Sequence, residues 1–173
     1  FNIITKRLNL FPYQMLFFSA FRYGNLQPAF PEIAGKTERK LSTLQADEQV
    51  LLLTGIASPA PIMQELEKYT SHIDLLAFDD HHNFSQRDIQ SIRERFKKLK
   101  GEQRLIITTE KDATRLVHHP VMDRELKKYI YILPIEVEIL QNQQDIFNQH
   151  IIGYVRENTR DGSFSERKDA HKS

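Results

Sequence analysis

The hydrophobic pattern of the chain changes near residue 48. After that point, short apolar runs alternate with stretches in which apolar residues recur every three or four positions. The runs Gln49 to Leu53, Ile73 to Phe78 and Arg104 to Ile107 predict strands that are covered on both faces. The stretches between them predict helices, because that spacing places the apolar side chains on one stripe. The alternation predicts an α/β three-layer sandwich with a mainly parallel sheet and right-handed crossovers.

The expected helices begin at residues that favour helix starts. Ser58 is predicted to cap a helix that has Pro59 at its first position and continues to about Tyr69. Ser85, with Asp88 three residues later, has the pattern of a capping box at the start of the next helix. These signals place helix starts shortly after the first two strands.

The chain before residue 48 predicts a different arrangement. A helix-like segment spans residues 2–10, and Met15 to Arg22 alternates in a way that suits a strand. A turn at Tyr23 to Asn25 and an extended piece ending at Phe30 complete a predicted two-stranded linker arm. Residues 31–47 are polar and irregular, as expected of a connector.

The C-terminal part predicts one more strand and one more helix. Tyr129 to Leu140 is strand-like, and Pro134 inside it indicates an edge or a bend. Asn142 to Glu157 is predicted to be a closing helix, followed by a polar mobile tail. We therefore expect three regions: residues 1–47 as the end of an N-terminal lobe with its linker, 48–158 as an α/β lobe, and 159–173 as the tail.

Composition excludes several classes of protein. The apolar share of 40% and charged share of 27% are typical of a globular fold, and the net charge of +1 gives no case for nucleic-acid binding. The absence of cysteine excludes disulfides and thiolate metal sites. No apolar run approaches the roughly 18–20 residues that span a bilayer, and no signal peptide is expected. Because Phe1 opens directly into a helix-like segment, we expect an excised part of a larger enzyme.

Three polar clusters follow three predicted strands: Thr54 to Ser58, Asp79 to His82, and Thr108 to Asp112. In parallel sheets, ligands bind beyond the carboxyl ends of the strands. Because these ends meet at one edge, the sequence predicts a functional site there.

The Asp79 to His82 cluster is the strongest candidate for chemistry. A carboxylate such as Asp80 beside the imidazole of His81 can fix its tautomer and make it a proton acceptor near neutral pH. The residues alone support equally well a turn capped by Asp80 with partly exposed histidines. His82 is the weaker candidate, because the residue next in sequence to His81 normally points in a different direction.

The third cluster also has two interpretations. Exposed amides at a helix start favour anions, and Lys111 adds a positive charge, so Thr109, Glu110, Lys111 and Asp112 are expected near substrate or nucleotide. Thr54 and Gly55 are expected there as well. The alternative is local capping by Thr109 or Asp112, with Glu110 and Lys111 in solvent.

Other candidate sites are weaker. Gly35-Lys36-Thr37 resembles the end of a phosphate loop, but Phe30 stands where the motif requires glycine, so a solvated linker is predicted. The Asp-His-His string also occurs in metal-dependent phosphoesterases, which need an upstream Asp-x-Asp that this chain lacks. His118 and His119 are expected on the surface. No complete metal site is predicted.

The ordered motifs resemble one family. They are Leu52-Leu53-Thr54-Gly55-Ile56-Ala57-Ser58-Pro59, Leu76-Ala77-Phe78-Asp79-Asp80-His81-His82-Asn83-Phe84 and Ile106-Ile107-Thr108-Thr109-Glu110-Lys111-Asp112-Ala113. In order and spacing they are similar to the tetraacyldisaccharide 4'-kinases, the lipid A 4'-kinases. The resemblance covers roughly residues 1–157. One departure is that Asp79 stands where the family often has proline, which implies a less rigid loop and a more basic His81.

The resemblance implies an activity and a division of labour. Such kinases transfer the γ-phosphate of ATP to the 4'-hydroxyl of a tetraacylated disaccharide 1-phosphate, peripherally at the cytoplasmic face of the bacterial inner membrane. Their N-terminal lobe supplies the phosphate loop, the Mg²⁺-binding acids and a general-base aspartate. The resemblance implies that His81, supported by Asp80, assists that aspartate, and that this chain alone is inactive. The expected partners are the lipid A disaccharide precursor and the chain's own N-terminal lobe.

Two other functions stay open at this point. One is a metal-dependent phosphoesterase built on Asp80, His81 and His82. The other is a noncatalytic module that docks a protein through the Phe17 to Phe30 arm and has no cleft at the strand ends.

Overall fold

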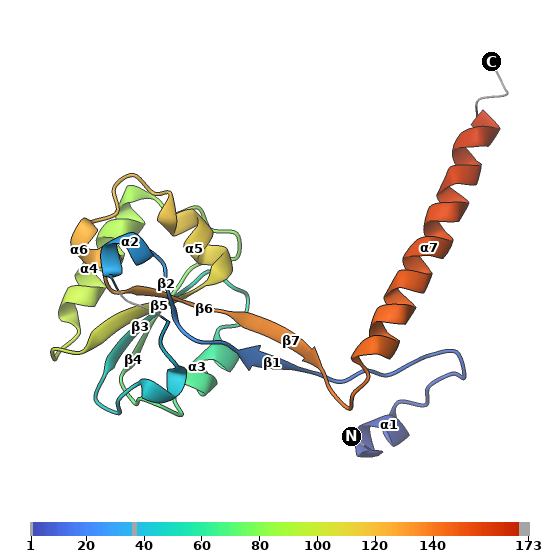
Figure 1. The fold of residues 1–173 in the computed structure, drawn as a ribbon, viewed down its shortest axis with the longest axis horizontal. Coiled ribbons are helices and arrows are strands. Elements are labelled where there is room, and N and C mark those ends of the chain that lie inside the picture. The colour runs from blue at the N-terminus through green and yellow to red at the C-terminus, as the bar shows by residue number, and fades with distance from the viewer. Residues whose placement is uncertain (1, 36–37, 170–173) are drawn as a thin grey trace. The chain divides into compact units, whose positions relative to one another are not determined.

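The computed structural model describes residues 2–35 and 38–169, shown as a ribbon in Figure 1. Lys36 and Thr37 of the phosphate-loop-like string lie outside the described residues. Residues 23–136 form one compact unit, and the chain before and after them forms a second.

The larger unit contains, among the described residues, a five-stranded sheet in the order β2-β6-β5-β3-β4. The strands are β2 (Gln27–Pro28), β3 (Gln49–Thr54), β4 (Ile73–Ala77), β5 (Arg104–Thr109) and β6 (Ile130–Leu133). The last four are parallel, and β2 pairs antiparallel with β6. The predicted mainly parallel sheet is confirmed, with β6 as a fourth parallel strand.

Helices cover both faces of this sheet (Figure 1). They are α2 (Pro31–Ala34), α3 (Ala60–Leu66), α4 (Gln86–Lys98), α5 (Glu110–Val117), α6 (Arg124–Lys127) and the 3₁₀ helix η1 (Leu41–Thr43). On β3, Leu51 and Leu53 pack with residues of α4, α5 and α6, whereas Val50 and Leu52 pack with residues of α3 and η1. Successive strand residues point to opposite faces, so an uninterrupted apolar run fills two cores. The three-layer architecture is therefore confirmed.

The structure confirms the predicted start of helix α4 and contradicts the predicted cap of helix α3. At α4, the Ser85 hydroxyl accepts from the Asp88 N–H at 3.3 Å, and the Asp88 carboxylate accepts from the Ser85 N–H at 2.7 Å, which confirms the capping box. At α3, the cap residue is Pro59 and no side chain caps the helix, so the predicted role of Ser58 is wrong. Pro61 in the first turn removes one of the N–H donors that such a cap would serve.

A two-stranded sheet is present, but its second strand differs from the prediction. Strand β1 (Ser19–Tyr23) pairs with β7 (Ile135–Ile139). The extended piece after the turn contains β2, which joins the edge of the five-stranded sheet instead. Pro134 separates β6 from β7, as the predicted bend requires, because proline cannot donate to a strand ladder.

The smaller unit also contains two helices, α1 (Asn2–Arg7) and α7 (Gln144–Asp169). The end predicted for the closing helix is wrong, because α7 continues through most of the expected tail. Phe17 packs edge-on against Phe147 of α7, with ring centroids 5.3 Å apart. Several large apolar side chains of α7 are nevertheless exposed, namely Ile146, Ile151, Ile152, Tyr154 and Val155. Within the described ranges, no helix is both long and apolar enough to cross a membrane.

The connector before β3 is held by a buried ion pair. Glu48 is 3% exposed, and its two carboxylate oxygens accept from the Arg39 guanidinium at 2.6 and 2.5 Å. The Gln45 N–H also donates to this carboxylate, at 3.2 Å. Bidentate pairing of this kind compensates for the desolvation of both charges.

Replacing Arg39 with methionine should lower the free energy of unfolding by about 3–5 kcal/mol, because an unpaired buried carboxylate remains. Lys68→Met is the matched control, since Lys68 is 63% exposed in its ion pair with Glu65 and exposed ion pairs contribute little to stability. Urea denaturation followed by circular dichroism measures both. Equal losses in the two variants would contradict the prediction.

Candidate functional site at the carboxyl edge of the sheet

One buried carboxylate joins two of the predicted polar clusters. Asp112 is fully buried, and its Oδ2 accepts from the Gly55 N–H at 2.9 Å and from the Thr109 hydroxyl at 2.8 Å. The Thr54 hydroxyl lies 3.5 Å from the same oxygen. The ends of β3 and β5 therefore meet, as the sequence predicted.

Gly55 brings the Asp79 to His82 cluster into the same arrangement. A Cβ atom built on Gly55 would lie 3.0 Å from both Asp112 Oδ1 and the Asp79 carbonyl oxygen. Contacts this short are tighter than nine in ten real Cβ contacts, so any larger residue would force Asp79 or Asp112 to shift, and glycine lets the three strand ends pack closely. The three clusters thus form one continuous edge.

The start of α5 is capped by its own side chains. The Thr109 hydroxyl accepts from the Asp112 N–H at 3.2 Å, and Glu110 is exposed. This is the local capping that the sequence left open as an alternative to ligand binding. Thr54, Thr109 and Asp112 are buried, so their contacts position the strand ends.

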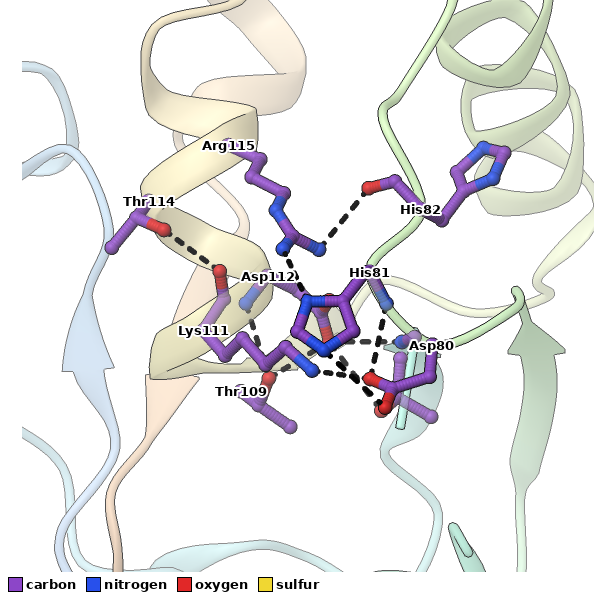
Figure 2. A network of polar contacts seen from close by, with 10 residues as sticks. Asp80, His81, His82, Thr109, Lys111, Asp112, Thr114 and Arg115 are labelled. Atoms are coloured by element: carbon purple, nitrogen blue, oxygen red, sulfur yellow. Dashed lines mark hydrogen bonds and ion pairs between the residues drawn. The ribbon is translucent and has the colours of Figure 1, made fainter. Parts of the chain in front are cut away.

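His81 stands at the tip of a tight turn above this edge (Figure 2). The turn closes through the His82 N–H, which donates to the Asp79 carbonyl at 3.1 Å. His81 has φ +62°, in the left-handed region, and its backbone N–H donates to Asp80 Oδ1 at 3.0 Å. Its ring is 74% exposed, so a ligand or another protein surface can reach it.

Two basic side chains of α5 reach this turn, as Figure 2 shows. Lys111 hydrogen-bonds Asp80, and this contact lowers the pKa of the Asp80 carboxyl. Arg115 lies 3.4 Å from His81 Nδ1 through one nitrogen, and its other terminal nitrogen donates to the His82 carbonyl at 3.2 Å. The opposite ring nitrogen of His81, Nε2, lies 3.7 Å from Asp80 Oδ2.

His82 points away from His81 and packs into the fold (Figure 2). Its ring stacks on Phe78 at 4.7 Å and meets Phe84 edge-on at 5.4 Å. Its Nε2 lies 3.0 Å from Asp88, the capping residue of α4. His82 therefore supports the loop and the helix start, as expected of the weaker candidate.

Sequence reasoning missed Arg115. The signal was present, because Arg115 follows Lys111 by four residues, and residues at that spacing lie on the same face of a helix. With Lys111 expected near the site, this spacing would have indicated Arg115 as a second cation on the same face of α5.

The geometry does not favour a metal centre. In the part of the chain that the structure describes, no group of three or more His, Asp or Glu side chains is placed to hold a metal ion. His81 and His82 also point apart, so the two imidazoles do not converge. A hollow of about 280 Å³ lies at the other end of the sheet, between Arg39, Gln103 and Tyr131 among others. His81 itself stands on open surface.

The family model for tetraacyldisaccharide-1-P 4'-kinase matches residues 17–155. The chain belongs to this family. The match includes the edge formed by β3, β4 and β5 and the turn that carries His81. The resemblance inferred from the sequence motifs is therefore confirmed.

Curated relatives named tetraacyldisaccharide 4'-kinase agree with this assignment. The Bacteroides fragilis protein is 72% identical over all of this chain, and the Bacteroides thetaiotaomicron protein is 67% identical. A Phocaeicola vulgatus protein is 50% identical over 95% of the chain. The chain spans about half the length of these relatives, 46%, 47% and 44% respectively.

A solved structure of the family was also found. It is the "apo" form of LpxK from Aquifex aeolicus in complex with ATP, at 14% identity and a TM-score of 0.43. The alignment covers 83% of this chain and 38% of that one.

The Gly55→Ala variant should unfold more easily by about 1–3 kcal/mol, since its methyl group would overpack against Asp79 and Asp112. Gly153→Ala is the control, because open space surrounds Gly153 inside α7 and alanine favours helices by about 0.5–1 kcal/mol. Urea unfolding measures both. Unchanged stability of Gly55→Ala would contradict the packing argument.

Acid should weaken the α4 start. Burial would raise the pKa of Asp88, but hydrogen bonds from Ser85 and His82 outweigh it and lower the pKa. Because the folded-state pKa lies below the unfolded value, the charged carboxylate stabilises the fold near neutral pH, and this contribution disappears as pH falls through the folded-state pKa. Asp88→Asn should therefore lose less stability than the wild type between about pH 5 and pH 2. If urea titrations showed the same loss of unfolding free energy with pH in Asp88→Asn and in the wild type, the prediction would be contradicted.

Proposed function

We propose that this chain is the lobe of a lipid A 4'-kinase that carries His81 to the acceptor hydroxyl. The complete kinase would transfer the γ-phosphate of ATP to the 4'-hydroxyl of a tetraacyldisaccharide 1-phosphate. The observation that carries the proposal is the exposed His81 ring, held beside Asp80 at the carboxyl edge of a parallel sheet in a member of this family. Ligands of such sheets bind at this edge.

His81 would act with a carboxylate from the rest of the kinase. Its exposed ring can hydrogen-bond that carboxylate and orient it toward the acceptor hydroxyl, whose proton the carboxylate takes. Phosphoryl transfer depends mainly on positioning and charge stabilisation, so a site assembled from two lobes is a reasonable design. Asp80 supports His81 from within the turn.

ATP and Mg²⁺ would be bound mainly outside this chain. The described residues offer no cluster of acids for the metal ion, and Thr109 caps the start of α5 itself. The Gly35-Lys36-Thr37 string lacks the glycine that a phosphate loop needs. The described residues of this chain therefore do not fit the two groups, which supports the proposal that the rest of the kinase binds them.

The smaller unit would pack against that other part. Its helices α1 and α7 each carry exposed apolar side chains: Ile3, Ile4, Ile146, Ile151, Ile152, Tyr154 and Val155. Exposed apolar surface of this extent marks an interaction site. A peripheral position at the cytoplasmic side of the inner membrane would bring the assembled site to its lipid A precursor.

The phosphoesterase alternative has less support. A phosphoesterase using Asp80, His81 and His82 would need both imidazoles on one metal ion, and His82 instead contacts Asp88. A noncatalytic docking module would leave turnover independent of His81. The following experiment separates that module from the kinase.

The test is a chimera in which this chain replaces the matching region of the Bacteroides fragilis relative, which is 72% identical. His81→Ala should lower kcat by about a hundred-fold or more, because the carboxylate that takes the proton would lose its orienting hydrogen bond, without changing the KM for ATP. Kinase assays with radiolabelled ATP and the lipid disaccharide measure both constants.

His118→Ala is the control, because His118 is exposed at the end of α5. Its turnover should match the parent chimera. Parent-like turnover in His81→Ala would overturn the role assigned to His81, and an inactive parent chimera would overturn the lobe assignment.

A further inference from the structure

Two cations from one face of α5 hold the turn that carries His81. Lys111 and Arg115 are four residues apart and therefore lie on the same face of the helix. Lys111 hydrogen-bonds the side chain of Asp80, and Arg115 contacts both the His81 ring and the His82 carbonyl. Figure 2 shows both side chains crossing to the turn.

The held conformation is not one that histidine adopts freely. At φ +62°, His81 is in the left-handed region, which a residue other than glycine keeps only where its surroundings enforce it. In this turn, the enforcing contacts are the Asp80 carboxylate on the His81 N–H and Arg115 on the next carbonyl. Such strain, when it is maintained, favours a functional role for the residue.

Arg115 also restricts the proton on the His81 ring. A guanidinium is always charged and can only donate hydrogen bonds, so the nitrogen facing it, Nδ1, has to be the acceptor. The neutral ring must then carry its proton on Nε2. That nitrogen lies 3.7 Å from Asp80 Oδ2, on a side chain that is 74% exposed.

The use of Arg115 is unusual for a structural arginine. No ion pair joins its guanidinium to a carboxylate within the described ranges, and its polar contacts go to an imidazole and a carbonyl. The buried side chains of α5 are those of Asp112, Ala113 and Leu116. Packing of α5 therefore does not require the arginine head group.

We propose that Arg115 is a positioning residue that keeps His81 in the Nε2–H tautomer and in the left-handed turn. His81 then presents an N–H donor to a carboxylate, instead of a free lone pair to the substrate. Lys111 acts in parallel by holding Asp80. This inference rests on the proposed function of His81 and specifies that Nε2 is the ring nitrogen that donates to the carboxylate.

The test uses the chimera with ¹⁵N-labelled histidine, and the His81 signals are assigned by their loss in His81→Ala. Ring ¹⁵N spectra should show an acceptor Nδ1 and a protonated Nε2 in the parent. Arg115→Met should shift His81 toward the other tautomer and lower kcat by about ten-fold, with the KM for ATP unchanged. Arg115→Lys keeps the charge without the forked donors, so intermediate values are expected.

Arg87→Met is the matched control, because Arg87 is an exposed arginine near the start of α4. Its spectra and turnover should match the parent. An unchanged His81 tautomer in Arg115→Met, or equal losses in the Arg87 and Arg115 variants, would overturn the inference. If Arg115→Met shifts the His81 tautomer but His81→Ala keeps the turnover of the parent, the proposed function is overturned, whereas the role of Arg115 in holding the tautomer stands.

Discussion

The buried carboxylate of Asp112 is the interaction on which the carboxyl edge of the sheet depends. It ties the end of β3 to the start of α5 through the Gly55 amide and the Thr109 hydroxyl. Without hydrogen bonds, a carboxylate at this depth would be costly. The tie also places Gly55 against the Asp79 carbonyl, so the turn of His81 is built directly on it.

This arrangement explains why the motifs of the family are spread over three strand ends. The buried residues Thr54, Thr109 and Asp112 build a platform, and the exposed residue His81 stands on it. Helix α5 contributes to both the buried platform and the exposed turn. Its first turn contains Asp112, whose N–H bonds the Thr109 hydroxyl, and Lys111 and Arg115 contact the turn of His81. A chain that spans 46% of the Bacteroides fragilis relative therefore contains the whole turn of His81 together with the side chains that hold it.

The predicted elements differ in how far local sequence decides them. The parallel strands and the α4 capping box were predictable, because apolar runs and cap spacing act within a few residues. The partner of β1 was not, since β1 and β7 are more than a hundred residues apart and pairing is decided by the whole fold. The Ser58 cap was wrong, because Pro59 is the cap residue and Pro61 removes one of the N–H donors that a side-chain cap would serve.

The sequence by itself determined which groups gather at the carboxyl edge, since every parallel strand delivers its following residues there. It also identified His81 over His82 as the better candidate. Only the tertiary structure decided the direction of each side chain: His82 turns into an aromatic cluster, whereas Arg115 crosses from α5 to the ring of His81. The reason is that motif spacing sets the position of a residue along the backbone, whereas contacts between distant segments set what its side chain meets.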